Sequence, residues 1–292
     1  MHHLKARPTQ STNLLQFWNH ASGLSATQVD MIINMGGAYL NGKRCKDPSH
    51  KVFPRDALEL YYRLPIEFQS LQWDPAWIIA QTPDYIIVNK PAGIPTQGRR
   101  DADSISLYDA LCRWQKGYVG LHHRLDQDTS GLMLFTLNPK VNRFFAQLFQ
   151  EQRIEKKYLA LCQGPWPFSH GEFTVDAPIG ADYGAKTQKQ KVGPQGKPAI
   201  THLRLIHAEQ DQLLIEASPK TGRTHQIRVH CAHVGIPLIG DQFYGHNGAP
   251  PFHLHCYSLA WPQMGPLKAG RFKSLPRWNA FDTFLQKKED GL

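Results

Sequence analysis

The polar stretch that ends in an apolar run at residues 120–135 constrains the fold more than any other part of the sequence. Between His122 and Asp128 it holds two histidines, one arginine and two aspartates, and an apolar run follows directly after Gly131. A short apolar run bounded by turn residues is typical of a buried strand. We therefore expect the polar cluster in a turn at the edge of the core. Charged groups there must be paired or used, because an unpaired buried charge is very costly.

Two interpretations fit this cluster. In the first it is a salt-bridged turn, in which Arg124 pairs with Asp126 or Asp128. The second follows from the order of the residues: His123-Arg124-Leu125-Asp126 followed by Thr129-Ser130-Gly131 resembles the signature of the RluA-type RNA pseudouridine synthases. In that family the aspartate of this motif is the essential catalytic residue. The resemblance therefore implies that Asp126 is catalytic.

Two further segments resemble the same family. The loop Asn89-Lys90-Pro91-Ala92-Gly93 is similar to the family's first segment, which borders the active site. Tyr158 matches a tyrosine that stacks on the target base in the family. By its surroundings alone, Tyr158 also fits a packing aromatic in a half-buried strand.

The segment 221–230, with the sequence TGRTHQIRVH, resembles the family's third segment. Its second arginine, Arg228, matches the arginine that forms a salt bridge to the catalytic aspartate. Independently of the family, an arginine among apolar neighbours requires a carboxylate. Asp126 is one candidate, and a structural pair with any other acid is the alternative. The resemblance covers about residues 77–262, with its segments in the family's order.

The resemblance implies a complete set of site residues. Arg124 resembles the residue that fills the space vacated by the flipped base. The predicted catalytic residues are Asp126, Tyr158 and Arg228. The predicted substrate-binding residues of the same domain are Arg124, His123, Thr129 and Arg223.

The charge of the chain favours an anionic partner. Lysine and arginine number 33 against 24 aspartates and glutamates, a net charge of +9, which fits nucleic acid, a membrane surface or an acidic protein. A membrane is the least favoured of these, because no basic amphipathic helix with a bulky apolar face stands out. Apolar runs stay far below the ~20 residues of a transmembrane helix, and residues 1–13 lack the apolar core of a signal peptide.

The five cysteines show neither zinc-binding nor redox-motif spacing. They are therefore expected to be reduced thiols of a cytoplasmic protein. We expect RNA as the partner, ribosomal RNA before transfer RNA, with no cofactor, no metal and no membrane, and a monomer.

Residues 1–70 are predicted to form a separate small domain. A capped helix begins at Ser25, a glycine pair at 36–37 ends it, and a strand at 38–40 enters an Asn-Gly turn, with another strand within 52–62. This order resembles the small RNA-binding module named after ribosomal protein S-four. The resemblance implies phosphate contacts from Lys43, Arg44 and Lys46, which supply affinity but little sequence specificity. A cap domain with a solvated basic turn is the alternative.

After a linker at 71–76, residues 77–292 are predicted to form the catalytic domain. Strands are expected at 77–80, 85–88, 132–135 and 154–161, and helices at 104–116 and from Asn138-Pro139 onward. The family resemblance implies an α+β fold: a mixed, mainly antiparallel sheet with flanking helices.

The chemistry of the family fits the residues present. Pseudouridine formation breaks the bond between ribose and nitrogen and rejoins the base through carbon, without a redox change. A carboxylate suits this as nucleophile, base or electrostatic stabiliser, and the sequence does not choose among the three. It contains no nicotinamide fingerprint, phosphate loop or metal cluster.

Two other classes of protein are alternatives. A non-catalytic RNA-binding protein on the same fold is disfavoured by the intact set of Asp126, Tyr158 and Arg228. A metal hydrolase could use histidines at positions 225, 230 and 233 or at 253 and 255. Their spacing does not form a known metal motif, which disfavours that class.

Overall fold

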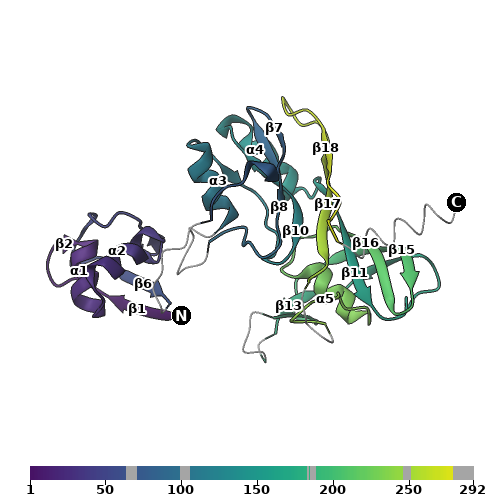
Figure 1. Cartoon of the computed structure of the whole chain (residues 1–292), viewed down its shortest axis with the longest axis horizontal. Helices are drawn as coiled ribbons and strands as arrows, with labels where there is room; N and C mark the ends of the chain where they lie inside the picture. Colours follow the sequence, from purple (N-terminus) through teal and green to yellow (C-terminus); the bar gives the residue numbers. More distant parts are fainter. Residues whose placement is uncertain (64–70, 99–105, 183, 185–188, 246–250, 279–292) are drawn as a thin grey trace. The chain divides into compact units, whose positions relative to one another are not determined.

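The computed structural model describes residues 1–63, 71–98, 106–182, 184, 189–245 and 251–278. The chain divides into two compact units: residues 1–74 with 94–117, and residues 75–93 with 118–292. Figure 1 shows the chain with most of its helices and many of its strands labelled.

The first unit contains a small sheet with the strand order β1-β6-β3-β4. Its elements are β1 (His2–Ala6), β2 (Thr12–Asn13), α1 (Leu14–Ser22), α2 (Ala26–Asn34), β3 (Ala38–Leu40), β4 (Lys43–Arg44), β5 (Lys51–Val52) and β6 (Leu58–Tyr62). Strands β2 and β5 form a separate pair. The two helices and the sheet enclose one core, which includes Leu14, Trp18, Ile33 and Leu60.

The helix and the hairpin predicted for this unit are confirmed. Ser25 caps α2 through a capping box with Gln28, which satisfies backbone groups that a helix start leaves unpaired. Strands β3 and β4 then pair across a turn in which Asn41 has φ 50° and Gly42 has φ 78°. These left-handed conformations are the ones that an Asn-Gly hairpin turn requires.

Helix α3 (Leu107–Gln115) belongs to the first unit, although the sequence analysis assigned its segment to the second domain. The predicted helix 104–116 includes positions 104 and 105, which lie outside the described residues. The ring of Trp114 stacks on Trp73 with centroids 5.4 Å apart. Lys46 Nζ lies 3.2 Å from Asp109 Oδ1. These contacts join residues far apart in the sequence, which local patterns do not reveal.

The second unit is built on a ten-stranded sheet, whose main path runs β12-β15-β16-β11-β17-β10-β8-β7. Its strands are β7 (Ile78–Gln81), β8 (Tyr85–Lys90), β9 (Gly120–Leu121), β10 (Ser130–Thr136), β11 (Glu155–Gln163), β12 (Glu172–Asp176), β15 (Ile200–Glu209), β16 (Gln212–Pro219), β17 (Leu254–Trp261) and β18 (Gly270–Lys273). Strand β18 pairs with β17, and β9 pairs with β10. The remaining elements of the unit are η1 (Pro75–Trp77), α4 (Pro139–Gln150), the hairpin of β13 (Ile179–Ala181) with β14 (Gln190–Val192), and α5 (Gln226–His233).

Within this sheet β10 and β17 run parallel, and the other pairs are antiparallel. The predicted α+β fold with a mixed, mainly antiparallel sheet is therefore confirmed. Helix α4 is also confirmed: Asn138 caps it, Pro139 occupies its first turn, and Val141, Phe145 and Leu148 are buried.

The start of β10 approaches β17 unusually closely. Gly131 has φ 114°, and a Cβ at this position would lie 2.4 Å from the backbone oxygen of Cys256. Glycine is therefore required where the polar stretch enters the sheet. This close approach fixes the point at which the loop carrying Asp126 leaves the core.

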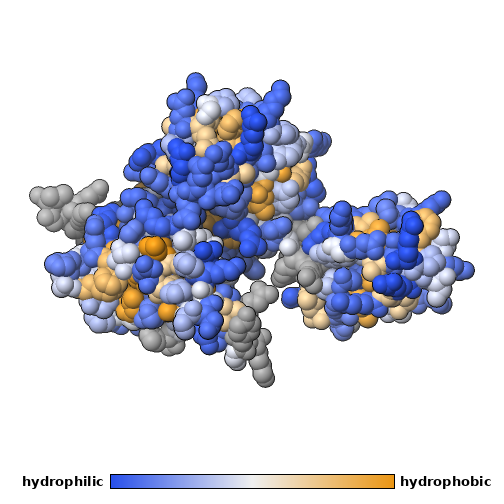
Figure 2. All heavy atoms as spheres, turned by 180° about the vertical axis from the view of Figure 1, so that it is seen from behind, coloured by the Kyte–Doolittle hydropathy of each residue, from blue (hydrophilic) through white to orange (hydrophobic). Residues whose placement is uncertain are grey.

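The described part of the chain contains no helix long and apolar enough to cross a membrane. On the face seen in Figure 2, hydrophilic residues cover most of the surface, and apolar residues form small patches between them.

Candidate active site

Asp126 lies in the loop between β9 and β10, at the wall of a pocket with a volume of about 100 Å³. The amide of Thr129 donates to the backbone oxygen of Asp126 at 3.2 Å, which closes the loop into a turn. Of the seven residues predicted for this domain's site, the structure brings six to the pocket wall: Arg124, Asp126, Thr129, Tyr158, Arg223 and Arg228. Among the described residues that line it, Asp126 is the single carboxylate.

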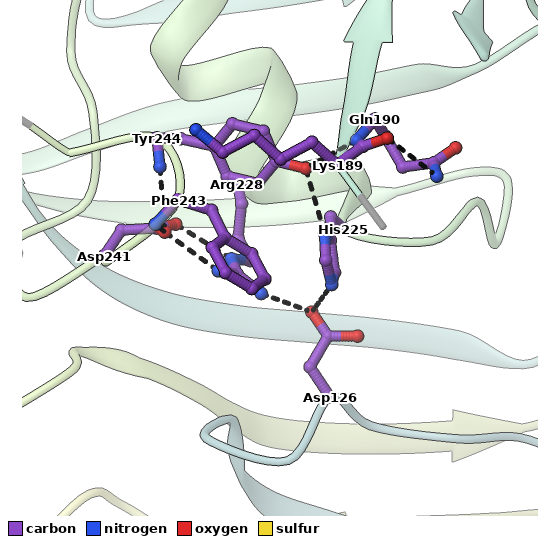
Figure 3. A network of polar contacts seen from close by, with 8 residues as sticks. All are labelled: Asp126, Lys189, Gln190, His225, Arg228, Asp241, Phe243 and Tyr244. Carbon is purple, nitrogen blue, oxygen red and sulfur yellow. Dashed lines mark hydrogen bonds and ion pairs between the residues drawn. The ribbon is translucent and has the colours of Figure 1, made fainter. Parts of the chain in front are cut away.

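The predicted contact between Asp126 and Arg228 is present. Arg228 Nη1 donates to Asp126 Oδ2 at 3.3 Å, as Figure 3 shows. In the described residues, Asp126 makes an ion pair with Arg228, and His225 Nε2 lies 3.9 Å from the same carboxylate oxygen. The alternative of a turn closed by Arg124 does not describe this segment.

Asp241 is the stronger partner of Arg228. Its two carboxylate oxygens accept from Nε and Nη2 of Arg228, both at 2.8 Å, and its side chain is fully buried. Burial alone would raise the pKa of Asp241, but the hydrogen bonds and charge of Arg228 outweigh it and lower that pKa. The bidentate pair locks the guanidinium, so that its remaining nitrogen points at Asp126. The sequence analysis did not identify Asp241 as a partner.

Tyr158 is directed into the pocket by an irregularity in the sheet. The register between β11 and β17 shifts between Lys157 and Tyr158, and such bulges redirect side chains beside functional sites. Tyr158 is 7% exposed, and burial raises the pKa of its hydroxyl well above the ordinary value. The ring is therefore a neutral aromatic surface in the wall that Asp126 shares.

His123, the seventh predicted site residue, lies behind the pocket. Its Nε2 accepts from the amide of Leu134 at 3.0 Å, and its ring stacks on Phe149 with centroids 4.9 Å apart. Burial lowers its pKa to about 3, so the ring is neutral. These contacts attach the loop that carries Asp126 to β10 and α4.

The other predicted residues line the pocket in different ways. Arg124 is exposed, whereas Thr129 is buried. Arg223 Nε donates to the carbonyl of Pro198 at 2.9 Å, which fixes its side chain at the rim.

A buried lysine supports the loop that carries Asp126. Lys90, the last residue of β8, is fully buried, and its Nζ donates to the carbonyls of Gln127 and Pro91, each at 2.9 Å. Burial lowers its pKa to about 7, and the charges of Asp128 and Asp126 offset only part of this effect. The lysine thus connects the end of β8 to the residue that follows Asp126.

This burial predicts a pH-dependent contribution to stability. Unfolding returns the pKa of Lys90 from about 7 to its ordinary 10.5, so the unfolded chain binds more protons between these values. Stability therefore rises with pH across this window. Compared with Lys90→Met, the wild type should gain unfolding free energy as the pH is raised from about 7 to about 10.

Urea denaturation over this pH range would measure the difference. Lys140→Met, at an exposed position, is the control and should show no such trend. A pH-independent difference between the wild type and Lys90→Met would contradict the predicted titration.

The basic residues predicted for the N-terminal unit differ in their local contacts. Lys43 is exposed on β4. Arg44 donates to the carbonyl of Gly36 and the hydroxyl of Tyr39, both at 2.7 Å. Lys46 pairs with Asp109. Of the three, Lys43 has the side chain best placed to meet an external phosphate.

Three polar residues around Asp126 were not predicted from the sequence as part of this site, although His225 was considered as a metal ligand. These are Asp241, His225 and Gln226. The Gln226 side chain accepts from Thr221 and Arg223 and donates to Ile200 and Thr201, which anchors the start of α5. All three lie in or just after the segment that resembles the family. Their closeness to that segment could have predicted them as site residues.

No cluster of three or more histidine, cysteine, aspartate or glutamate side chains able to hold a metal ion occurs in the described ranges. Two of the histidines considered for a metal hydrolase make other contacts: His230 bonds Thr201 and the carbonyl of Ala177, and His255 bonds Ser130 and the carbonyl of Ser274.

Comparison with known proteins gives the class. The family model for RNA pseudouridylate synthase matches residues 84–233. The Bacillus subtilis (strain 168) RNA pseudouridine synthase YlyB is 33% identical over 233 residues, which are 76% of this chain and 75% of that protein. The ribosomal large subunit pseudouridine synthase D of Haemophilus ducreyi is 34% identical over 226 residues, which cover 75% of this chain and 67% of that protein.

Solved structures agree with this class. The human RNA pseudouridylate synthase domain containing 4 superposes with a TM-score of 0.57 at 25% identity, over 69% of this chain and 89% of that one. The human RNA pseudouridylate synthase domain containing 1 gives 0.54 at 25% identity, over 74% and 98%. The chain therefore belongs to the RNA pseudouridine synthase family, and to its RluA-type branch. It is an enzyme that isomerises uridine in RNA.

Proposed function

We propose that this enzyme modifies uridine in ribosomal RNA and that Asp126 is its essential residue. The observation that carries the role of Asp126 is its position as the single carboxylate among the described residues lining the pocket. The choice of ribosomal RNA is supported by relatives whose names specify the large ribosomal subunit.

The exposure and contacts of Asp126 support this role. Its side chain is 29% exposed, while Arg228 holds one of its oxygens. The reaction breaks the bond from ribose C1′ to uracil N1, turns the base, and joins C1′ to C5. A carboxylate fixed by Arg228 and open on its other side can meet the ribose or the base throughout this sequence.

Tyr158 supplies an apolar surface for the base. A uridine must leave its stack to enter the pocket, which costs a few kcal/mol. Stacking on an aromatic ring returns about 1–3 kcal/mol per base. Tyr158 is thus proposed to hold the target base beside Asp126. Arg124, exposed at the rim, is proposed to fill the space that the base leaves.

The N-terminal unit is proposed to bind the RNA backbone, mainly through Lys43, and the enzyme to work in the cytoplasm. Phosphate contacts of this kind position an RNA without reading its sequence. Full-length Lys43→Gln should lose one phosphate contact, which reduces the log–log slope of RNA affinity against salt by about 0.7–0.9.

Affinity for a ribosomal RNA transcript across a salt series tests this prediction. Lys51→Gln, an exposed position on β5 of the same unit, is the control with the same charge change. A slope of wild-type size for Lys43→Gln would argue that the N-terminal unit does not bind phosphate through this residue.

The target is tested by mapping pseudouridine in ribosomal and transfer RNA from strains with and without the gene. The proposal expects positions in ribosomal RNA that lose the modification and regain it when the gene is restored. If pseudouridine were lost only from transfer RNA, the substrate would be transfer RNA and the proposal would be wrong.

A further inference from the structure

His225 occupies a left-handed backbone conformation, which is uncommon for non-glycine residues although histidine is enriched there. It precedes the first residue of α5 with φ 57°, and its side chain makes no capping hydrogen bond. No capping hydrogen bond from its own side chain compensates for this left-handed conformation. Backbone strain of this kind concentrates at functional sites. The conformation brings the imidazole to the pocket wall.

The imidazole lies against the catalytic carboxylate. His225 Nε2 is 3.9 Å from Asp126 Oδ2, the same oxygen that Arg228 contacts. The other ring nitrogen, Nδ1, lies 2.9 Å from the hydroxyl oxygen of Tyr244. Figure 3 shows this chain of contacts from Asp126 through His225 to Tyr244.

The contacts of Tyr244 indicate which ring nitrogen carries the proton. Its hydroxyl oxygen accepts from the amide of Gln190 at 2.9 Å. Among the hydrogen bonds of the described residues, the acceptor available to its O–H is Nδ1 of His225. With Nδ1 accepting, a neutral imidazole carries its proton on Nε2. That N–H faces the carboxylate of Asp126.

The charges around the ring agree with this arrangement. Burial lowers the pKa of His225, and the charge of Asp126 offsets this only in part, while Arg228 lowers it further. The ring is therefore neutral near pH 7. At 3.9 Å this N–H is beyond direct hydrogen-bond distance, and its dipole favours the facing carboxylate oxygen without neutralising it.

We propose that His225 is a positioning residue for Asp126, with its Nε2–H fixed by the hydroxyl of Tyr244, which the backbone of β14 anchors. Arg228 and His225 then approach one oxygen of Asp126 from two directions and leave the other oxygen to the substrate. This inference rests on the proposed essential role of Asp126.

Substitutions at position 225 can separate the effect of the side chain from the effect of the backbone strain. Glycine tolerates positive φ, so His225→Gly removes the donor and relieves the strain. Glutamine adopts φ 56° at Gln152 and 52° at Gln210 in this chain, so His225→Gln keeps an N–H donor in the same conformation. His233→Gln, at the exposed end of α5, is the matched control.

The assay uses total RNA from a strain lacking the gene, labelled with uridine tritiated at C5, because pseudouridine formation releases that hydrogen. For His225→Gly we expect kcat to fall on the order of 10²-fold, the effect of misplacing a reacting group, with KM for RNA and the unfolding midpoint close to wild type. His225→Gln should recover much of the loss. Tyr244→Phe should lower kcat less, and should add little to His225→Gly because both act through one contact.

Three results would overturn the inference: a wild-type kcat for His225→Gly, no recovery by His225→Gln relative to His225→Gly, or a loss confined to KM. Tritium release by the wild type tests the proposed function, whereas the variants at 225 test the inference about His225. Activity of Asp126→Asn in the same assay would refute the role of Asp126 itself, whatever the variants at 225 do.

Discussion

Asp126→Asn is expected to abolish pseudouridine formation while leaving RNA binding within a few fold of wild type. The substitution keeps the shape of the side chain and removes its charge. Phosphate contacts dominate the affinity of proteins for RNA, so losing one carboxylate should have little effect on binding. Turnover should stop because no other carboxylate occurs among the described residues that line the pocket.

The fold should tolerate this change. The side chain of Asp126 is 29% exposed and its ion pair with Arg228 is 3.3 Å long, so water can solvate the asparagine that replaces it. Arg228 also keeps both bonds to Asp241. Tritium release and RNA binding should be measured on the same preparations. Asp128→Asn, an exposed position two residues away, is the matched control and should stay active; substantial turnover by Asp126→Asn would refute the assigned role.

Arg228→Met is expected to cause the largest loss of stability. It leaves the carboxylate of Asp241 buried without its partner, and breaking a buried pair in this way costs about 3–5 kcal/mol. Activity should also fall close to zero, because Asp126 loses the group that orients it. Urea denaturation measures the first effect and tritium release the second.

A double-mutant cycle separates the two carboxylates that contact Arg228. Asp241→Asn removes the charge but keeps an oxygen for the amides of Phe243 and Tyr244, which donate to Asp241 Oδ1 at 2.8 and 3.1 Å. Coupling in stability between Arg228→Met and Asp241→Asn should be large, up to about 3 kcal/mol. Coupling with Asp126→Asn should be much smaller, because Asp126 remains partly solvated. Equal coupling to both would mean that Asp241 is not the main partner.

The local elements were predictable because their causes lie close together in the chain. The capping box at Ser25, the Asn-Gly turn after β3 and the proline at the start of α4 each act within a few residues. The sequence motif likewise placed Asp126, Tyr158 and Arg228, since their order along the chain matches a family. The contact of Asp126 with Arg228 followed from the same resemblance.

The details of the site depended on long-range packing. Lys90 and Gln127 lie far apart in the sequence and meet only because β8 pairs with β10. His123 was predicted as a substrate contact from its place in the motif, and only the structure shows that its ring stacks on Phe149.

By itself, then, the sequence determined the family through the order of its motifs, and the family resemblance implied the α+β class and most of the predicted residues that line the pocket. Only the tertiary structure decided which partners those residues take. A buried charge such as that of Arg228 requires a counter-charge, but several acids along the chain satisfy the requirement equally well. The choice of Asp241, with Asp126 left open to the pocket, is made by the geometry that brings α5, the loop after β9 and the segment before Phe243 together in space.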